Sequence, residues 1–426
     1  MRKNCSTRLK DMDSPEIVAR KVKAVSDSLA HAGTETKNRI LGQLEQLLGE
    51  RQNYLFAENQ KDIRAAEKAG LAKSLIDRLR IDDKIIREMQ GSLRDVINLP
   101  DPVGDIVKTW KRPNRLLVGK MRIPIGVILI IYESRPNVTV EAFSLCLKSG
   151  NAVILKGGSE AYHSNRALYT LIREALAGSA VDEDIVKLVE TADRDYIYSL
   201  LKMDDYIDLV IPRGGEALIR NVVEQSRIPV LKHYKGVCHI FVDEFASFDM
   251  ACDVCVNAKA QKPATCNAME TLLIHEAIAK TFLPEIAKRF KKQGVKLKGC
   301  KKARAILKDI ERVQEKEWHE EYLDLTLNVK IVADMEEAIA HIRKYGSNHT
   351  DAIITRNYDR AWEFMREVNS SLTLVNASTR LNDGFQLGLG AEMGISTTKL
   401  HAFGPMGLEE LTITKFIAFG DGQLRT

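Results

Sequence analysis

The fold is decided by the stretch GVILIIYESRPN at residues 126–137. Its first part, GVILIIY, is almost wholly apolar, and short runs of this kind are typical of strands buried on both faces of a parallel sheet. Further short apolar runs follow at residues 152–156, 185–189, 207–211 and 228–231, and helix-like segments separate them at 137–149, 159–178, 193–203 and 214–226. This alternation predicts βαβ units with helices on both faces of the sheet.

The flanking segments extend this pattern. Residues 14–98 show helical periodicity and dense charge, which predicts a helical layer before the sheet. Residues 109–122 and 411–419 alternate in polarity, and we expect them to form an exposed β arm. A second α/β segment begins near residue 238, with strands expected at 239–243, 270–275, 321–332, 351–355 and 372–376 and helices at 248–261, 336–345 and 358–368. The predicted fold class is therefore α/β with two sheets.

Composition excludes several kinds of protein. The chain has 426 residues, 45% of them hydrophobic, which suits two or three domains with separate cores. Its 63 basic and 58 acidic residues leave an excess too small to indicate nucleic acid as a partner. Residues 1–5 are basic, but charges recur at 8–13, which argues against a secretory signal. The most apolar run, 125–132, is far shorter than the about 20 residues that span a membrane.

The cysteines argue for a reducing, cytoplasmic location. There are seven, an odd and scattered set that does not suggest a disulfide framework: Cys5, Cys146, Cys238, Cys252, Cys255, Cys266 and Cys300. Cys252 and Cys255 form a C-x-x-C, but no second Cys/His pair follows at ligand spacing, and the segment reads as a helix. Two buried thiols on one helix face is the favoured interpretation, and no metal is expected.

Cys266 is the candidate nucleophile. It stands in QKPATCNAMET at residues 261–271, in a connection interrupted by Pro263, after a helix-like stretch and before an apolar strand. A thiol at such a turn is placed for chemistry rather than for packing.

Three strand ends carry residues suited to ligand binding, because ligands in open parallel sheets bind beyond the carboxyl ends of the strands. Lys156-Gly157-Gly158-Ser159 and Arg213-Gly214-Gly215 each place glycines before a helix, where a phosphate can bind. Neither matches G-x-G-x-x-G, and each is as consistent with a plain tight turn. Glu133, Arg135 and Asn137 gather at the third end. There the alternative is a helix cap at Asn137 and a Glu133–Arg135 ion pair.

Seven runs together resemble one family. IYESRPN (131–137), LKGG (155–158), IPRG (211–214), PATCNA (263–268), HTDA (349–352), NASTR (376–380) and GLGAE (388–392) are similar to those of the gamma-glutamyl phosphate reductases, a branch of the aldehyde dehydrogenase superfamily. The resemblance extends in order from about residue 15 to 417. It implies a Rossmann-like NADPH-binding domain (1–108 and 125–236), a catalytic cysteine domain (237–380), a β oligomerisation arm (109–124 and 400–420) and a return to the cofactor domain (381–399).

The resemblance also implies the reaction. Members of this family reduce L-glutamyl 5-phosphate with NADPH to L-glutamate 5-semialdehyde and phosphate, through a cysteine thioester, as the second step of proline biosynthesis. A homo-oligomer is implied, and the glutamate kinase that supplies the substrate is expected to be a separate chain.

Residue roles follow from the matched runs. Asn137 and the backbone N–H of Cys266 would hold the acyl oxygen, and Lys156 would contact the adenosine ribose. Ser159 stands where relatives that prefer NAD often have glutamate, which favours NADPH and NADP. Glu321 would contact the nicotinamide ribose. The remaining expected cofactor-binding residues are Gly157, Gly158, Arg213, Gly214 and Gly215.

Three features separate this chain from its wider superfamily. Oxidising aldehyde dehydrogenases keep a water-activating glutamate before the strand expected at 239–243, whereas residues 230–236 read VLKHYKG. Gln386 and Phe403 replace arginines of many relatives, which leaves Arg135 and Arg380 as candidates for substrate binding. A structural ion pair is an equally supported role for Arg380.

Two alternative functions stay open. An acylating aldehyde dehydrogenase that uses acyl-CoA would also lack the glutamate. A non-catalytic relative that binds nucleotide or partner proteins is the other alternative, and Cys266, Asn137 and Lys156 together argue against it.

Overall fold

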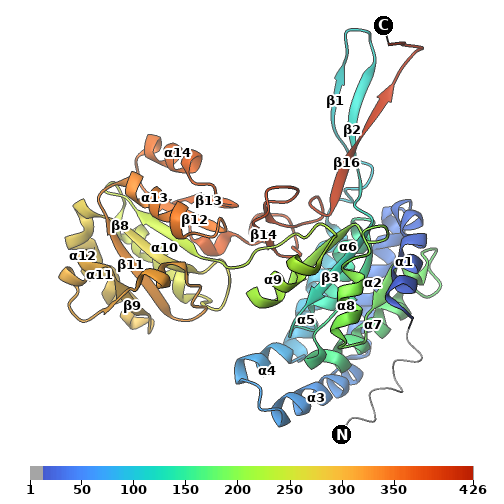
Figure 1. The fold of residues 1–426 in the computed structure, drawn as a ribbon, viewed down its shortest axis with the longest axis horizontal. Helices are drawn as coiled ribbons and strands as arrows, with labels where there is room; N and C mark the ends of the chain where they lie inside the picture. The colour runs from blue at the N-terminus through green and yellow to red at the C-terminus, as the bar shows by residue number, and fades with distance from the viewer. Residues whose placement is uncertain (1–12, 426) are drawn as a thin grey trace. The chain divides into compact units, whose positions relative to one another are not determined.

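The computed structural model describes residues 13–425, so the basic residues 1–5, with Cys5, lie outside the described part. The chain forms two compact units (Figure 1). Unit 1 contains the described part of Met1–Leu231 together with Leu389–Gly394 and the described residues from Met406 onward. Unit 2 contains Lys232–Gly388 and Ile395–Pro405.

A four-stranded parallel sheet forms the centre of unit 1. The strands are β3 (Val127–Tyr132), β4 (Ala152–Lys156), β5 (Val186–Leu188) and β6 (Leu209–Arg213), in the order β5-β4-β3-β6. Helices α6 (Val138–Lys148), α7 (Tyr162–Leu176), α8 (Arg194–Leu200) and α9 (Glu216–Gln225) follow β3, β4, β5 and β6 in turn. All six residues of β3 are buried, as expected for a central parallel strand. The predicted βαβ pattern is confirmed.

One predicted strand of this sheet is wrong. Instead of a strand at residues 228–231, the described chain has a single bridge between Val210 and Val230. The run IPVL contains Pro229, which lacks the backbone N–H that a ladder of hydrogen bonds requires, so pairing does not extend beyond this point.

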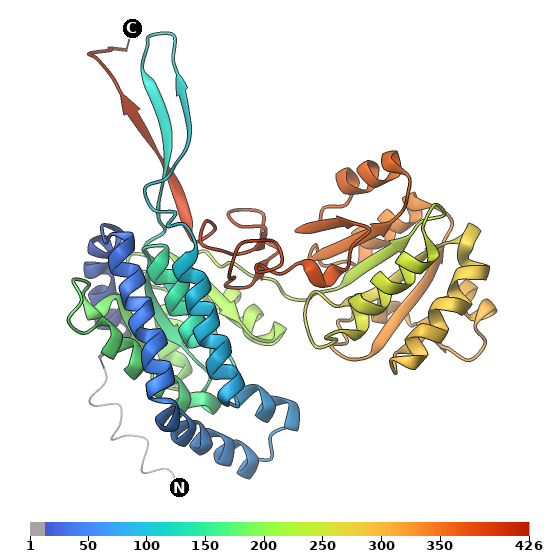
Figure 2. The same cartoon turned by 180° about the vertical axis from the view of Figure 1, so that it is seen from behind.

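Five helices precede the sheet of unit 1, and they pack on the sheet or on one another and on the helices that cover it. They are α1 (Pro15–Ala30), α2 (Thr34–Glu50), α3 (Gln52–Lys68), α4 (Lys73–Leu79) and α5 (Asp83–Asn98). The last of them buries Ile86, Met89, Leu93 and Val96, whose spacing of three or four residues places them on one helix face. Helix α1 packs on β4, and α2 packs on α5 and α7 (Figure 2). The helical layer is as predicted.

A three-stranded antiparallel arm projects from the helices of unit 1 (Figure 1). The middle strand is β2 (Leu117–Pro124), flanked by β1 (Ile106–Lys111) and β16 (Thr412–Phe419). The arm exposes several large apolar side chains: Ile106, Val107, Leu117, Ile413, Phe416 and Phe419. Few buried contacts hold these strands to the rest of the unit, so the arm presents an apolar surface to its surroundings.

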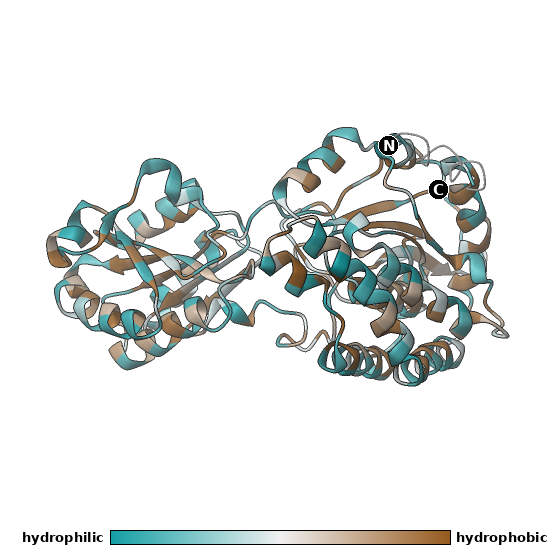
Figure 3. Cartoon of the chain, turned by 90° about the horizontal axis from the view of Figure 1, so that it is seen from below, coloured by the Kyte–Doolittle hydropathy of each residue, from teal (hydrophilic) through white to brown (hydrophobic). Residues whose placement is uncertain are grey.

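Unit 2 contains a seven-stranded sheet in which every neighbouring pair is parallel. In spatial order its strands are β10 (Glu311–Arg312), β9 (Lys296–Gly299), β11 (Thr326–Val332), β8 (Met269–His275), β7 (Cys238–Val242), β12 (Thr350–Ile354) and β13 (Leu372–Val375). The apolar residues lie on the strands and the inner faces of the helices (Figure 3).

Helices cover both faces of this sheet. One face is covered by α10 (Phe248–Ala260), α11 (Glu276–Lys292) and α12 (Lys301–Ile306), and the other by α13 (Met335–Tyr345) and α14 (Tyr358–Glu367). A two-stranded ribbon, β14 (Ile395–Ser396) with β15 (Gly404–Pro405), completes the unit. Helix α11, strands β9 and β10 and helix α12 lie where no element is predicted, and β11 begins at Thr326 rather than at residue 321.

The thiols of the described chain are all free. Cys252 and Cys255 lie on α10 and are buried in the core of unit 2, which confirms the interpretation of the C-x-x-C as packing on a helix face. Between residues 13 and 425, no helix is long and apolar enough to cross a membrane.

Candidate active site

Cys266 lies in the connection between α10 and β8. Helix α10 ends at Ala260, and Pro263 shortly afterwards lacks the N–H that a continuing helix would need. The hydroxyl of Thr265 donates to the backbone oxygen of Lys262 at 2.8 Å, which closes a tight turn just before the thiol. Cys266 is half-buried. A thiol at the tip of an ordered turn is accessible to a small substrate.

The backbone of this turn is held by close neighbours. Cys238 donates its thiol proton to the backbone oxygen of Cys266, with an S–O distance of 3.2 Å. Gly236 approaches the same oxygen so closely that a Cβ at this position would lie 1.8 Å from it. The side-chain amide of Asn267 donates to the backbone oxygen of Asn382 at 2.9 Å. These contacts fix the position from which the thiol acts.

Two histidines lie beside the thiol. His233, Cys266 and His349 each offer a side-chain donor atom, and these atoms lie within 4.8 Å of one another. The rings of His233 and His349 have centroids 5.6 Å apart. Burial lowers the pKa of His349 well below its usual value, and a positive charge on His233 would lower it further. His349 is therefore neutral at physiological pH.

Cys238 differs from Cys266 in reactivity. It is fully buried at the start of β7, and burial raises its pKa well above the usual value for a thiol, with the nearby Asp351 carboxylate adding to the effect. A thiol kept protonated in this way is a poor nucleophile. Of these two neighbouring thiols, only Cys266 combines exposure with a place in a turn.

Arg380 lies close enough to the thiol for their charges to interact. Burial lowers the pKa of Arg380, and the negative charge of a Cys266 thiolate opposes this shift. The guanidinium Nε donates to the neutral side-chain oxygen of Gln261 at 3.0 Å, and within residues 13–425 no carboxylate forms an ion pair with Arg380. The charges of Asp383 and of a Cys266 thiolate both act on the guanidinium, so substrate binding by Arg380 stays a prediction.

The two positions where arginine was expected also lie in unit 2. Gln386 is exposed in the turn that follows Asp383, whose carboxylate accepts from the Gln386 backbone N–H. The ammonium group of Lys399 lies over the ring of Phe403, 5.2 Å from the ring centroid. A cation thus lies near the ring at one of the two positions where arginine was expected.

A buried ion pair holds together the two elements that flank the nucleophile. Lys259 near the end of α10 donates to Glu270 near the start of β8 at 2.7 Å, and both side chains are fully buried. Burial raises the pKa of Glu270, Lys259 opposes the shift, and the charge of Glu321 adds to it. The sequence reasoning missed this pair. A lysine on a buried helix face and a glutamate at the start of an apolar strand were the available signals.

Asn137 begins helix α6 in unit 1. It occupies the N-cap position, but in the described chain its side chain makes no capping hydrogen bond. The alternative of a helix cap is therefore wrong for the side chain, whose amide is left for another partner. Glu133 accepts from the backbone N–H of Gly215 at 2.9 Å, and Arg135 is exposed.

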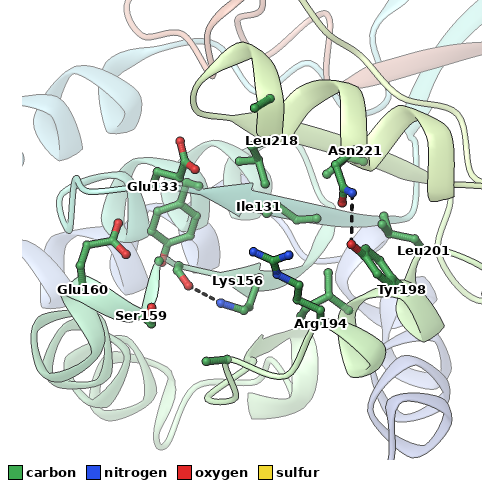
Figure 4. A pocket seen from close by; sticks show the side chains of 17 residues that line it. Ile131, Glu133, Lys156, Ser159, Glu160, Arg194, Tyr198, Leu201, Leu218 and Asn221 are labelled. Carbon is green, nitrogen blue, oxygen red and sulfur yellow. Dashed lines mark hydrogen bonds between the residues drawn. The ribbon is translucent and has the colours of Figure 1, made fainter.

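Unit 1 also contains a pocket of about 540 Å³ at the carboxyl ends of β3 and β4 (Figure 4). Predicted residues line one side of it: Lys156, Gly157, Gly158 and Ser159. Burial lowers the pKa of Lys156, and the charge of Glu160 opposes this shift. The ammonium group of Lys156 donates to the backbone oxygen of Gly157 at 2.5 Å. Pocket volume and position at the strand ends suit a nucleotide.

The second glycine run, at residues 213–215, lies at the end of β6 in unit 1. Arg213, Gly214 and Gly215 lie outside the set of described residues that line this pocket. A Cβ on Gly214 would lie 2.3 Å from a carboxylate oxygen of Glu133, so a side chain at this position would displace the Glu133 carboxylate. Arg213 packs against Gly394, where a Cβ would lie 2.1 Å from its guanidinium. Glu321 lies in unit 2, before β11.

The opposite wall of the pocket was missed by the sequence reasoning. It is formed by α8 and α9 and includes Arg194, Tyr198 and Asn221, with a hydrogen bond of 3.1 Å between the last two. Figure 4 shows the Arg194 guanidinium and the Lys156 ammonium turned toward the same part of the pocket. Arg194 follows β5, so the rule that directed attention to the other strand ends could have found it.

The architecture agrees with that of known proteins. The sequence model of the aldehyde dehydrogenase family matches residues 6–305. An engineered glycolyl-CoA reductase with bound NADP⁺ shares the fold at 16% identity, with a TM-score of 0.67 over 95% of this chain and 96% of that one. The chain belongs to the aldehyde dehydrogenase family, whose members use a nicotinamide cofactor.

More similar proteins define the branch. The gamma-glutamyl phosphate reductase of Thermodesulfovibrio yellowstonii is 54% identical over 97% of this chain and all of that protein. The crystal structure of the enzyme of this name from Thermotoga maritima is 45% identical, with a TM-score of 0.95 over 97% of this chain and all of that one. Within its family, the chain is a member of the gamma-glutamyl phosphate reductases.

Proposed function

We propose that this chain reduces L-glutamyl 5-phosphate to L-glutamate 5-semialdehyde and phosphate, a step of proline biosynthesis, with Cys266 as the nucleophile. The observation that carries the proposal is the segment packed against Cys266. Gly236 contacts its backbone and His233 lies beside its thiol, yet residues 230–236 contain no carboxylate. A thioester formed there meets no carboxylate from this segment that would activate water, and is preserved for reduction.

The protein's part in the reaction begins with the thiol. The Cys266 thiolate attacks the acyl carbon, phosphate leaves with the bonding electrons, and a thioester remains on Sγ. The nicotinamide cofactor supplies a hydride when bound. The thioester becomes a hemithioacetal, which collapses to the aldehyde and releases the thiolate for the next cycle.

Attack by the thiolate and transfer of the hydride both place negative charge on the acyl oxygen. The side-chain amide of Asn137 and the backbone N–H of Cys266 are the proposed donors to it, and one such donor is typically worth about 100- to 1000-fold in rate. The anionic groups of the substrate are assigned to Arg380 and Arg135. Arg380 is supported by the electrostatic effect of the thiolate upon it.

Cofactor binding is assigned to the pocket of unit 1, and thiol chemistry to unit 2. Lys156 and Arg194 place two cations in the pocket, beside the carboxylates of Glu133 and Glu160, and Ser159 contributes no negative charge. The two cations favour NADPH over NADH, since the 2'-phosphate is the only group by which the two cofactors differ. Gly157 and Gly158 allow the backbone to approach the nucleotide. Arg213, Gly214, Gly215 and Glu321 remain proposed cofactor contacts without support from this pocket.

The experiment that tests the proposal runs the reaction in reverse. Purified protein receives L-glutamate 5-semialdehyde and NADP⁺, with phosphate, with coenzyme A or with neither, and NADPH is followed by its absorbance. Turnover that requires phosphate supports the proposal. Turnover that requires coenzyme A indicates the acylating alternative, and no NADPH under any condition contradicts catalysis of this reaction.

Three further assignments accompany this function. The exposed apolar side chains of the arm support a homo-oligomer, since a patch of this kind on β1, β2 and β16 is typical of an interface. The acyl phosphate must be supplied by a kinase that acts on glutamate, which we assign to a separate chain. The described cysteines, Cys266 among them, form no disulfide, which suits a reducing cytoplasm.

A further inference from the structure

The side chains around the nucleophile form a set of metal-binding ligands. His233 comes from the segment before β7, Cys266 from the connection before β8, and His349 from the residue that precedes β12. Their donor atoms lie within 4.8 Å of one another, although the residues are far apart in the sequence. They lie before the amino ends of β7, β8 and β12, which are neighbouring parallel strands in the sheet of unit 2.

One of the three has a buried nitrogen that needs an explanation. His349 is 0% exposed, and its Nε2 has no hydrogen-bond partner among the residues that the structure describes. Its Nδ1 is within hydrogen-bond distance of the Thr350 hydroxyl, at 2.8 Å. Buried polar atoms almost always have a partner, so the unpaired Nε2 of His349 is suited to accept a ligand.

The chemistry of the set selects the ligand. Two imidazole nitrogens and a thiolate suit Zn²⁺, and they do not suit Mg²⁺ or Ca²⁺, which prefer oxygen. In a tetrahedral zinc site the N and S donors lie about 3.6 Å apart, as follows from bond lengths of about 2.1 and 2.3 Å. Separations within 4.8 Å therefore require side-chain shifts of only about 1 Å.

The contact of His349 with Thr350 fits this arrangement. Ligating histidines almost always donate their second ring N–H to a neighbouring acceptor, which fixes the ring and the tautomer. With Nδ1–H donating to the Thr350 hydroxyl, the lone pair of Nε2 is available to a metal.

We propose that His233, Cys266 and His349 bind one Zn²⁺ reversibly, and that the bound metal inhibits the enzyme by capping the nucleophile. The thiol loses its proton to solvent, an Sγ–Zn bond forms, and a water molecule completes the fourth position. The sulfur electron pair that attacks the acyl carbon is then shared with the metal. Zinc binding itself does not depend on the proposed function, whereas inhibition does.

The test measures binding and inhibition separately. The full-length protein is first treated with a chelator, which removes any metal and leaves full activity if the metal is an inhibitor. Co²⁺, a spectroscopic substitute for Zn²⁺, is then titrated in. We expect one equivalent per chain, with a thiolate-to-cobalt charge-transfer band and the visible spectrum of a tetrahedral site. Zn²⁺ should displace the cobalt, abolish activity and protect Cys266 from alkylation.

Variants identify the ligands. His233→Gln, His349→Gln and Cys266→Ala should each weaken Zn²⁺ binding by at least about 10-fold, since even outer partners of a zinc site are worth that much. Cys300→Ala, a half-buried thiol outside the cluster, is the matched control and should bind like the unmodified protein. His233→Gln keeps the test valid if the buried His349→Gln does not fold.

Unchanged affinity in both histidine variants would overturn the site and show adventitious binding to the thiol alone. Loss of activity on chelation would also overturn the proposal, because it would make the metal a resident cofactor. Binding without inhibition would leave the metal site and contradict the role of Cys266 as nucleophile.

Discussion

Replacement of Gly236 by alanine should disable the nucleophile without unfolding the protein. A Cβ at this position would lie 1.8 Å from the backbone oxygen of Cys266, and real Cβ atoms do not approach closer than 3.0 Å. The two backbone segments must therefore move apart by at least 1.2 Å, the difference between these two distances. The obstacle is backbone, which cannot rotate away as a flexible side chain would.

A shift of this size affects chemistry more than binding. Misplacing a reacting group by about 1 Å costs about 100-fold in rate, or about 2.7 kcal/mol in the barrier. We expect kcat of Gly236→Ala to fall about 100-fold, with a smaller change in KM for the cofactor, whose proposed pocket lies in unit 1. The assay is phosphate-dependent NADPH formation from L-glutamate 5-semialdehyde, with thermal unfolding measured in parallel.

The matched control is Gly42→Ala in α2. No heavy atom of the described residues lies within 4 Å of a Cβ placed there, and alanine is favoured over glycine in a helix by about 1 kcal/mol. Its kcat should match that of the unmodified protein. A Gly236→Ala variant with kcat within about threefold of normal would refute the claim that this close contact positions the nucleophile.

Three further predictions concern the cofactor, acid stability and assembly. Arg194→Ala should lower kcat/KM for NADPH by about 10- to 100-fold and leave kcat/KM for NADH unchanged, since a hydrogen bond to a charged group is worth about 1.5–3 kcal/mol. Equal losses for both cofactors would contradict the assignment of Arg194 to the 2'-phosphate. Arg166→Ala, on α7, is the control. Burial lowers the pKa of His341 to about 2, so the unfolded chain, with the ordinary value of 6.5, takes up a proton first as the pH falls. The stability that neutral His341 contributes is complete above pH 6.5 and is lost at about 1.4 kcal/mol per pH unit below it. The free energy of unfolding of His341→Gln, measured with urea, should therefore fall less steeply with decreasing pH than that of the unmodified protein. His31→Gln, at an exposed position, should show the same pH dependence as the unmodified protein. Phe416→Asp should raise the dissociation constant of the proposed oligomer about 10- to 100-fold for each substituted side chain in the interface, measured by light scattering, because one buried apolar side chain is worth about 1.5–3 kcal/mol. An unchanged mass at low concentration would argue against the arm as interface.

Local patterns in the sequence were sufficient for most of the fold. The all-apolar run at 127–132 and the helices after each strand follow from period and composition, which depend only on neighbouring residues. The failed strand at 228–231 shows the limit, since Pro229 leaves only one bridge where the apolar pattern suggested a ladder. Helix α11 contains Pro284 in its interior, which weakens the helical signal of that segment.

The site was predictable where chemistry and chain position coincide. Cys266 stands out because it lies in a proline-interrupted turn before an apolar strand. Lys156 stands out because it is the last residue of an apolar strand. The approach of Gly236 to Cys266 was not predictable, nor was the gathering of His233 and His349 beside the thiol. These contacts join residues from separate strand ends of the sheet, so they depend on its strand order rather than on any local pattern.

The central claim is that Cys266 forms a thioester that water does not hydrolyse. The most direct test mixes the protein with L-glutamate 5-semialdehyde and NADP⁺ in the absence of phosphate and measures NADPH within the first turnover. The account predicts a burst of one NADPH per chain that then stops, a glutamyl group on the peptide containing Cys266 by mass spectrometry, and no burst from Cys266→Ala. Continuous NADPH formation without phosphate, or an equal burst from Cys266→Ala, would contradict it.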